Sequence, residues 1–226
     1  MIYFNESISV DNANDAFDYW YKKLTSDMEK EESRDGDVVG EIINAVTVIK
    51  DPTRNICNGL RNMNMRYAVG ELLWYMSGRN TLKSIQNITS AWDRMSDDGE
   101  TVNSNYGYCI VNKYGFNQLN YVIKLLEENP NTRQAVIHIK EPNNKPSKDV
   151  NCTVCLQFFI RDNKLYLTTY MRSNDLWMGF PYDVFQFTNF QILVAMYLGI
   201  EVGTYTHIAG SLHLYERNVK EVDNAK

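Results

Sequence analysis

A predicted β-hairpin over residues 153–171 constrains the fold more than any other segment of this sequence. Residues 153–160 and 165–171 are two strand-like runs, and the four residues that separate them include Asp162-Asn163. Two such runs joined by a short polar turn predict a pair of antiparallel strands. This pair departs from a regular alternation of parallel strands and helices, and it therefore argues for an α+β fold.

The rest of the chain interleaves helices with strands. Apolar residues at three- and four-residue spacing predict helices over residues 15–28, 65–76, 119–126 and 183–198. Runs of β-branched or alternating apolar residues predict further strands over residues 38–49, 135–139 and 203–208. In the first of these strands we expect Ile42, Val46 and Val48 to share one face. The sequence thus predicts a single α+β domain over residues 1–226.

Composition and charge exclude several classes of protein. Of the 226 residues, 44% are hydrophobic and 23% are charged, which is typical of a globular protein and not of a disordered one. The net charge of −5 argues against a non-specific nucleic-acid binder, which must neutralise phosphates. The sequence predicts neither a signal peptide nor a membrane span. The four cysteines then indicate reduced thiols, and we expect a cytoplasmic protein.

Cys152 and Cys155 are the first candidates for chemistry. A CxxC pair is compatible with zinc or redox chemistry, but side chains alternate along a strand, so these two thiols should point apart. The three histidines are scattered and no second CxxC occurs, so we expect no metal site. Cys152 follows a polar loop and opens a strand. It is therefore either an accessible nucleophile or a packed thiol, and spacing alone leaves both interpretations open.

Three other segments carry polar groups in unusual places. Glu71 lies within the apolar stretch YAVGELLWYM, where it is either a buried functional carboxylate or a surface glutamate of a helix. The run from Arg172 to Asp175 brings a cation, a hydroxyl, an amide and a carboxylate to the end of a strand, as in a ligand site or a solvated turn. Tyr106, which precedes Gly107, indicates by itself only a turn.

Taken together and in order, these segments resemble the thymidylate synthase superfamily. The motifs are GELLWYMSG, NSNYG, the strand that opens at Cys152 and contains Gln157-Phe158, then MRSND, GFPYD and GSLHLYERN, and the similarity runs from about residue 34 to residue 218. Within the superfamily the match looks closest to the phage deoxycytidylate hydroxymethylases. The resemblance implies a three-layer α+β fold with a mixed β-sheet that packs sheet-on-sheet in a homodimer.

The implied homodimer would explain strand faces that otherwise look too apolar. These faces carry the aromatic residues Phe158, Phe159, Tyr166 and Tyr170. In the family an arginine that matches Arg133 reaches the phosphate in the partner subunit's site. Where the family usually has a second arginine next to it, this chain has Gln134, so we expect one weaker phosphate contact.

The resemblance also implies a covalent mechanism of one-carbon transfer. Cys152 matches the nucleophile that attacks C6 of a pyrimidine nucleotide, which turns C5 into a carbon nucleophile. The one-carbon unit comes from the co-substrate 5,10-methylenetetrahydrofolate. Glu71 matches the glutamate that organises water and proton transfer, and Tyr106 matches the tyrosine associated with removal of the C5 proton.

The same resemblance implies binding residues for the nucleotide and the folate. The residues that match nucleotide-binding positions are Arg34, Arg133, Arg172 and Ser173 at the phosphate, His213 and Tyr215 at the sugar hydroxyl, and Gln157. The residues that match folate-binding positions are Asp175, Trp92 and Gly179.

Asp183 stands where thymidylate synthases carry asparagine, and this difference predicts the substrate. A carboxyl group accepts a hydrogen bond from the N4 amino group of cytosine, whereas its anion faces the O4 lone pairs of uracil. Mispairing a buried polar site costs roughly 1–3 kcal/mol per unsatisfied group. We therefore expect dCMP as the substrate. The alternative role for Asp183 is to cap a helix that begins there.

The product depends on what adds to the exocyclic methylene that remains after folate leaves. Hydride would give a methyl group, and water would give a hydroxymethyl group. A short polar segment after HLYERN, in place of the family's apolar closing tail, favours water. The alternatives are a thymidylate synthase acting on dUMP, a CMP hydroxymethylase, and an inactive paralogue that binds nucleotide or RNA.

Overall fold

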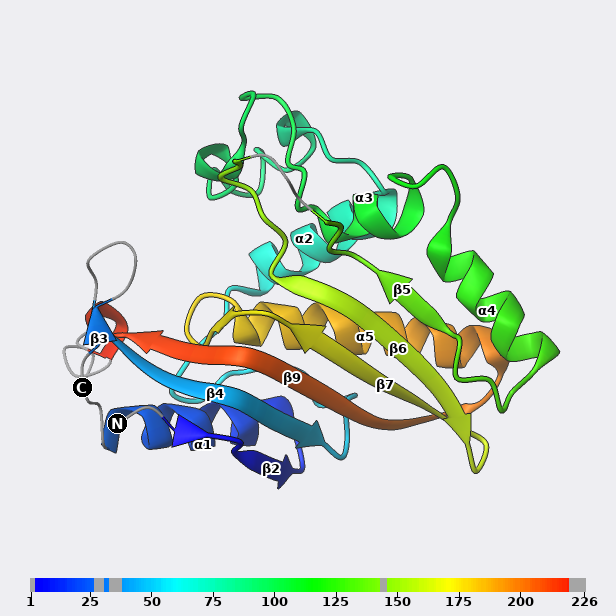
Figure 1. Cartoon of the computed structure of the whole chain (residues 1–226), viewed down its shortest axis with the longest axis horizontal. Coiled ribbons are helices and arrows are strands. Elements are labelled where there is room, and N and C mark those ends of the chain that lie inside the picture. The colour runs from blue at the N-terminus through cyan, green and yellow to red at the C-terminus, as the bar shows by residue number, and fades with distance from the viewer. Residues whose placement is uncertain (1–2, 27–30, 33–37, 143–145, 220–226) are drawn as a thin grey trace. The chain divides into compact units, whose positions relative to one another are not determined.

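The chain forms two compact units, whose helices and strands are labelled in Figure 1. The computed structural model describes residues 3–26, 31–32, 38–142 and 146–219. Residues 1–63 and 164–226 form the first unit, termed the sheet unit, and residues 64–163 form the second, termed the helical unit. Helices and strands are mixed in the chain, as the α+β prediction requires. The single domain over residues 1–226 stays a prediction.

Three long strands form the mixed sheet of the sheet unit. The central strand β9 (Glu201–Tyr215) pairs antiparallel with β4 (Val38–Ile49) and parallel with β7 (Lys164–Met171). The short strands are β1 (Tyr3–Phe4), β2 (Ser7–Val10) and β3 (Glu31–Glu32), which pair with β4, and β8 (Asn174–Asp175), which pairs with β9. The parallel β7–β9 pair and the antiparallel β4–β9 pair make the sheet mixed.

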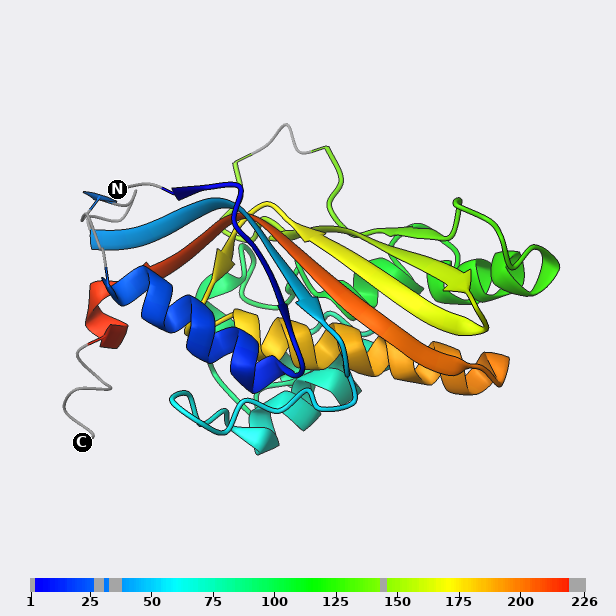
Figure 2. The same ribbon diagram turned by 90° about the horizontal axis from the view of Figure 1, so that it is seen from below.

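Helix α1 (Ala13–Ser26) covers one face of this sheet (Figure 2). Its apolar side faces the core, and the buried indole N–H of Trp20 donates to Oγ1 of Thr47 on β4 at 2.8 Å. The helix begins close to the predicted boundary because Asn12 caps it, with Oδ1 accepting from the N–H of Asp15. Residue 28, the predicted end, lies outside the described residues.

Helix α5 (Phe180–Leu198) lies on the same face of the sheet (Figure 2). It is buried over most of its surface, which explains why its sequence is apolar almost all round. Gln191 is fully buried, and its Nε2 donates to the carbonyl groups of Leu165 at 2.8 Å and Gly203 at 3.1 Å. The β7–β9 register is irregular at this point, so the glutamine supplies donors that the strand ladder does not.

A kink crosses β4, β9 and the line of β7 and β8 at one level. On β4, Asn44 has a positive φ of 58°. On β9, the alternation of buried positions shifts by one at residues 210–211. The line of β7 bends at Arg172 and resumes in β8, where Asn174 pairs with Leu212 in unchanged register. Beyond the kink, the other set of alternate residues therefore faces the core.

The prediction that one face of β4 is buried along the whole strand is wrong, because the kink changes which residues face the core. Ile42 is buried, whereas Val46 and Val48, which were expected to share its face, are only half-buried. The buried residues after the kink are Ala45, Thr47 and Ile49. A period of two carries one face along a whole strand, and this rule fails where a residue leaves the extended conformation.

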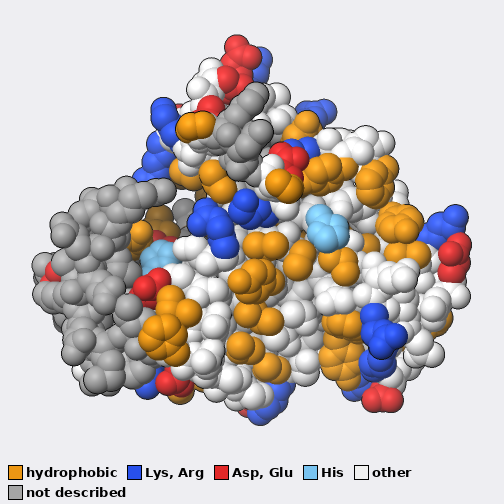
Figure 3. Space-filling model, viewed as in Figure 1, with side chains coloured by type: hydrophobic (Ala, Val, Ile, Leu, Met, Phe, Trp, Pro, Cys, Tyr) orange, Lys and Arg blue, Asp and Glu red, His pale blue; other side chains and the backbone are white. Residues whose placement is uncertain are grey.

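The face of the strands opposite α1 and α5 carries exposed aromatic side chains. Tyr170 is 38% exposed and Tyr166 is half-buried, and Figure 3 shows hydrophobic side chains spread over this face. In the helical unit, Phe159 is half-buried as well, but Phe158 is fully buried and contributes nothing to an exposed face. The sheet-on-sheet homodimer stays a prediction.

The helical unit combines short helices with one pair of strands. The helices are α2 (Met65–Ser77), η1 (Leu82–Ser84), η2 (Asp93–Met95), α3 (Tyr106–Val111) and α4 (Gln118–Glu128), and the strands β5 (Val136–His138) and β6 (Thr153–Arg161) pair antiparallel. The three α-helices begin at Asn64, Asn105 and Asn117, whose side chains accept from backbone N–H groups of the first turn. The caps at Asn64 and Asn117 explain why the predicted boundaries of α2 and α4 hold closely. Helix α3 was not predicted, since Tyr106 was expected only in a turn.

Two predicted boundaries at the C-terminal side of the chain are wrong. The helix predicted from residue 183 begins earlier, at Phe180, because Pro181 fits the first turn of a helix. The strand predicted over residues 203–208 continues to Tyr215. The segment Ala209-Gly210-Ser211 has the composition of a strand end, but in the structure it is the level at which the strand kinks.

The predicted turn after β6 is confirmed. Asp162 and Asn163 have φ values of 49° and 57°. Two consecutive residues in this region form the type I′ turn that joins two strands, and asparagine and aspartate tolerate it better than most residues.

We predict that Gly107→Ala destabilises the protein by at least about 3 kcal/mol, because an added Cβ would lie 1.9 Å from the carbonyl oxygen of Tyr75 on α2. Gly70→Ala is the milder control, since the three atoms nearest to its added Cβ all belong to the side chain of Ile88 and none to the backbone. There the gain in helix propensity, about 1 kcal/mol, offsets the repacking. Urea unfolding of both variants measures the difference, and equal stabilities would contradict the close approach of α2 and α3.

Candidate active site

The sheet unit gathers several predicted site residues just beyond the kink. Arg172 is exposed and Ser173 half-buried at the bend between β7 and β8. Asp175 follows on β8 and lies beside His213 of β9 in the parallel register. We call this group, together with Asp183, the sheet cluster.

His213 lies between two carboxylates. Asp175 is its neighbour on one side, and Glu41 of β4 is its cross-strand partner on the other. Burial lowers the pKa of His213, and the charges of Asp175 and Glu41 act in the opposite direction. The ring of Tyr215 stands edge-on to His213 with centroids 5.4 Å apart, and the Arg217 guanidinium lies 4.2 Å from the centre of the Tyr215 ring. The two residues predicted at the sugar hydroxyl are thus adjacent.

Asp175 has both a local structural role and spare hydrogen-bonding capacity. Its Oδ1 accepts from the backbone N–H of Trp177 at 2.8 Å and of Met178 at 3.0 Å, which shapes the turn before α5. Among the described residues, its Oδ2 has no hydrogen-bond partner. Asp175 can therefore accept a hydrogen bond from a ligand without giving up its turn.

Asp183 ends a buried chain of polar side chains. Its Oδ2 accepts from Nδ2 of Asn174 at 2.8 Å. The Oδ1 of Asn174 lies 2.9 Å from Nε2 of His207, and Nδ1 of His207 lies 2.8 Å from the hydroxyl of Tyr205. The alternative role of Asp183 as a helix cap is wrong, because α5 begins earlier, with Gly179 at the N-cap position.

His207 is neutral in the folded protein. It is 1% exposed, and burial lowers its pKa from the usual value to about 3. A neutral imidazole has one donor and one acceptor nitrogen. Since Asn174 presents its oxygen to Nε2, that nitrogen carries the proton, and Nδ1 accepts from Tyr205. Burial also raises the pKa of Tyr205, which keeps its hydroxyl protonated.

Asn174 and His207 are hydrogen-bonded to each other, and Asn174 to Asp183, although no sequence motif pointed to either residue. Asn174 was visible only as the amide within the segment MRSND, and His207 was counted among scattered histidines. The kink and the parallel β7–β9 pairing bring these two residues together. Neither the kink nor the pairing can be predicted from the spacing of residues in the sequence. Gly179 is predicted at the folate, and its missing Cβ has a second explanation: a Cβ there would lie 2.9 Å from Nδ2 of Asn174 and 3.1 Å from Oδ2 of Asp183.

In the helical unit, Glu71 is a buried carboxylate. It is 4% exposed on α2, and the hydroxyl of Tyr67, one helical turn earlier, donates to its Oε1 at 2.6 Å. The interpretation of Glu71 as a surface glutamate is therefore wrong. A carboxylate held in this way can move protons or order water.

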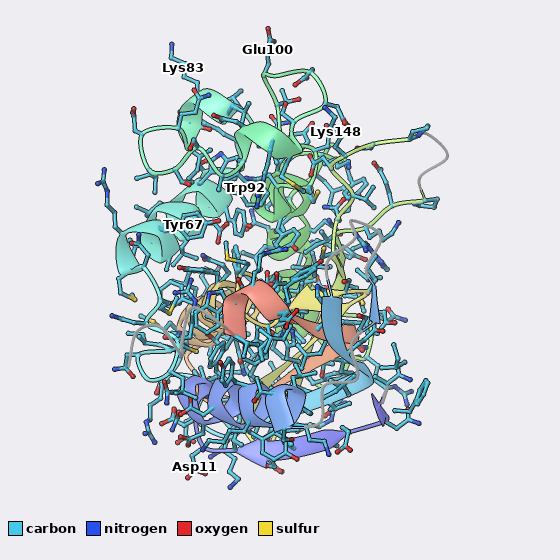
Figure 4. All side chains as sticks on the ribbon, turned by 90° about the vertical axis from the view of Figure 1, so that its left-hand side faces the viewer. Asp11, Tyr67, Lys83, Trp92, Glu100 and Lys148 are labelled. Atoms are coloured by element: carbon cyan, nitrogen blue, oxygen red, sulfur yellow. The ribbon has the colours of Figure 1, made fainter. Side chains whose placement is uncertain are left out.

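Tyr106 and Trp92 lie in the same unit. Tyr106 begins α3, is 8% exposed and has its ring centroid 5.5 Å from that of Tyr75. Trp92 packs edge-on against Trp74 at 5.4 Å, and its indole N–H is buried without a hydrogen-bond partner among the described residues. Figure 4 labels Trp92 and Tyr67 within the helical unit. A buried N–H without a partner is a position where a ligand could supply an acceptor.

Cys152 is half-exposed immediately before β6. The preceding segment is anchored to the segment that leads into α3: Asp149 Oδ2 accepts from the N–H of Ser104 at 2.9 Å, and Asn151 Nδ2 donates to the Ser104 carbonyl at 3.3 Å. Tyr106 follows Ser104 by two residues. These bonds therefore fix the start of α3 relative to Cys152. The thiol is half-buried, so both interpretations of Cys152 stay open.

The remaining predicted phosphate residues are less well defined. Arg133 is exposed beside a surface hollow that Asn131 and Thr132 also line. The carbonyl of Arg133 accepts from Nε2 of Gln157 at 2.9 Å, so part of the Gln157 amide serves the backbone. Arg34 lies outside the described residues. Substrate contacts for these three residues stay predictions.

Comparison with known proteins identifies the family. A family model described as thymidylate synthase matches residues 15–225. A deoxyuridylate hydroxymethyltransferase of Bacillus phage SP01 is 36% identical over 170 residues, which are 69% of this chain and 44% of that protein. A thymidylate synthase of Bacillus licheniformis is 28% identical over 165 residues, 69% of this chain and 59% of that protein. The match spans about half the length of these relatives. The chain belongs to the thymidylate synthase family, as the sequence motifs predict.

Two features are absent from the described residues. None of their helices combines the length and apolar character needed to cross a membrane. Their His, Cys, Asp and Glu side chains form no group of three or more that could hold a metal ion.

We predict that His207 makes the protein less stable in acid. The unfolded chain binds a proton at His207 near pH 6.5, whereas the folded protein does so only near pH 3, so the stability is complete above pH 6.5 and falls below it. Between pH 6 and pH 4 this amounts to about 2–3 kcal/mol. His207→Gln, which does not titrate, should lose that part of the slope. Urea unfolding from pH 7.5 to 4 measures it, and identical slopes for both proteins would contradict the prediction.

Proposed function

We propose that this protein is a deoxycytidylate 5-hydroxymethyltransferase, which transfers a one-carbon unit to C5 of dCMP. The observation that carries the proposal is the carboxyl of Asp183, which accepts a hydrogen bond from Asn174. A group held as an acceptor suits the N4 amino group of cytosine and opposes the O4 lone pairs of uracil. Family membership supports the reaction class, since the relatives are named as a hydroxymethyltransferase and a thymidylate synthase.

Cys152 is the proposed nucleophile. When bound, 5,10-methylenetetrahydrofolate would supply one carbon at the oxidation level of formaldehyde. The thiolate of Cys152 forms a bond to C6, which makes C5 nucleophilic; C5 then takes up the carbon and loses its proton. After tetrahydrofolate leaves, water adds to the exocyclic methylene of the base, and Cys152 leaves C6. The sum is dCMP, methylenetetrahydrofolate and water giving 5-hydroxymethyl-dCMP and tetrahydrofolate.

The residues predicted at the folate fit such a ligand chemically. The buried N–H of Trp92 has no acceptor among the described residues, and a folate ring system offers several. Asp175 has an oxygen available for a donor of the pterin. Glu71, held by Tyr67, would order water and pass protons. Tyr106 is the proposed group for removal of the C5 proton.

Nucleotide binding is proposed to use charge and hydrogen bonds around the sheet cluster. Arg172 and Ser173 would hold the phosphate, and His213 with Tyr215 would hold the sugar hydroxyl. Arg133 is proposed to act in the partner subunit's site of a homodimer. The exposed aromatic side chains of β7, such as Tyr170, are compatible with that assembly.

A second candidate is a hydroxymethyltransferase acting on dUMP. The observation in its favour is the phage SP01 relative, whose name gives deoxyuridylate as its substrate. The role assigned to Asp183 separates the two candidates, because uracil presents no amino group to this acceptor.

We predict that the protein converts dCMP, methylenetetrahydrofolate and ¹⁸O-labelled water to 5-hydroxymethyl-dCMP that carries the label. Mass spectrometry of the nucleotide measures the product. Cys152→Ala should reduce turnover by at least about a thousandfold, because the covalent bond to C6 cannot form. Cys155→Ala is the matched control and should remain active. A methylated nucleotide with dihydrofolate would overturn the proposed product, and a fully active Cys152→Ala would overturn the covalent mechanism.

We predict that Asp183→Asn shifts the ratio of kcat/KM for dCMP over dUMP toward dUMP by at least about tenfold, because an amide can donate to O4. Steady-state assays with both nucleotides measure the ratio. Asp162→Asn, in the turn after β6, is the matched control and should leave the ratio unchanged. An unaltered ratio for Asp183→Asn would exclude Asp183 as the group that selects the base.

A further inference from the structure

Among Tyr205, His207, Asn174 and Asp183, which are joined by hydrogen bonds, Asp183 is the most exposed. Tyr205, His207 and Asn174 are at most 2% exposed, whereas Asp183 is half-buried. The donor and acceptor atoms of each hydrogen bond in this chain lie 2.8–2.9 Å apart. A hydrogen-bond chain with one partly exposed end can transmit an orientation from the core to that end.

The chain has a definite direction. The protonated hydroxyl of Tyr205 donates to Nδ1 of His207, and Nε2–H of His207 donates to Oδ1 of Asn174. That last bond fixes the rotation of the amide, so Nδ2–H of Asn174 points to Asp183 and donates to its Oδ2. If the amide were reversed, its oxygen would face the carboxylate, and its N–H would face the N–H of His207.

Packing holds this chain in place. The ring of Phe180 stands edge-on to His207 at 5.2 Å between centroids. The absence of a Cβ at Gly179 leaves the space through which Asn174 reaches Asp183. The neutral imidazole, the fixed amide and the carboxyl therefore form one preorganised unit within the sheet cluster.

We propose that Asn174 and His207 are positioning residues for base selection: they hold the carboxyl of Asp183 as a hydrogen-bond acceptor and so favour a pyrimidine with an amino group at position 4 over one with a carbonyl oxygen. The inference rests on the proposed role of Asp183 as the group that meets the base. A carboxylate has about four acceptor positions, and the bond from Asn174 occupies one of them.

This hydrogen-bond chain, termed the relay, explains selection of dCMP over dUMP in a way that Asp183 alone does not. A carboxyl group can also carry a proton and then donate to a carbonyl oxygen, which would admit uracil. The N–H that Asn174 donates to Oδ2 favours the ionised carboxylate of Asp183, which can only accept hydrogen bonds. It disfavours the protonated carboxyl group, which could donate to the carbonyl oxygen of uracil. Loss of the donor at residue 207 frees the amide of Asn174 to turn, and the discrimination against dUMP falls.

The test measures binding of dCMP and of dUMP by isothermal titration calorimetry, which needs no folate and no turnover. His207→Leu removes the donor at similar volume and should lower the dCMP-to-dUMP affinity ratio at least about tenfold, the effect expected of one mispaired buried hydrogen bond. His207→Gln keeps an N–H donor and should hold the ratio within about threefold of wild type. If His207→Leu does not fold, Asn174→Ala is expected to lower the ratio equally.

Thr188→Val is the matched structural control. Thr188 is fully buried on α5 and accepts from Asn55 at 3.0 Å, outside the chain that ends at Asp183. The dCMP-to-dUMP affinity ratio of Thr188→Val should equal that of wild type. A ratio unchanged in His207→Leu and Asn174→Ala, or lowered equally by Thr188→Val, would overturn the relay.

Asp183→Asn in the same titrations separates this inference from the proposed function. If Asp183→Asn shifts the ratio and the His207 and Asn174 variants do not, only the relay fails. If wild type does not prefer dCMP, or if Asp183→Asn leaves the ratio unchanged, the proposed role of Asp183 fails, and the inference that rests on it fails with it.

Discussion

The kink shared by β4, β9 and the line of β7 and β8 is the constraint on which the sheet cluster depends. A strand that bent alone would leave backbone groups of its neighbours without partners, which is costly in a buried sheet. Here the three lines bend at one level, so β8 continues the register of β7 against β9. Because the buried alternation shifts at this level, Asn174 faces the core as Met171 does, although the two are three residues apart. Only in this arrangement can Asn174 meet His207.

The buried polar chain follows from the same geometry. An uncharged imidazole and an amide can lie in the core at little net cost when each hydrogen-bonding group has a partner, whereas a charged imidazole could not. Burial keeps His207 neutral and Tyr205 protonated. The core thereby supplies a fixed donor to a carboxyl near the surface. The cost of this arrangement is sensitivity to acid, since protons are held more tightly by the unfolded chain than by the folded one.

Much of the fold could be predicted from local pattern, because the signals were local. Helices α2 and α4 begin at asparagine caps next to periodic apolar runs, and the turn at Asp162-Asn163 carries its own backbone preference. The face of β4 and the length of β9 could not be predicted, since both depend on the kink. For the site, the family motifs pointed to Glu71 and Asp183, but they gave no sign that Asn174 and His207 belong with Asp183.

The sequence by itself determined the family, the order of the elements and the chemical types at the site: a thiol at Cys152, a carboxyl at Glu71 and a carboxyl at Asp183. Each of these features can be predicted from the sequence because motifs and periodicity are properties of neighbouring residues. Only the tertiary structure decided that Glu71 is buried against Tyr67, that Asp183 does not cap its helix, and that His207 reaches Asp183 through Asn174. These facts depend on strand register and burial, which join residues that are distant in the chain.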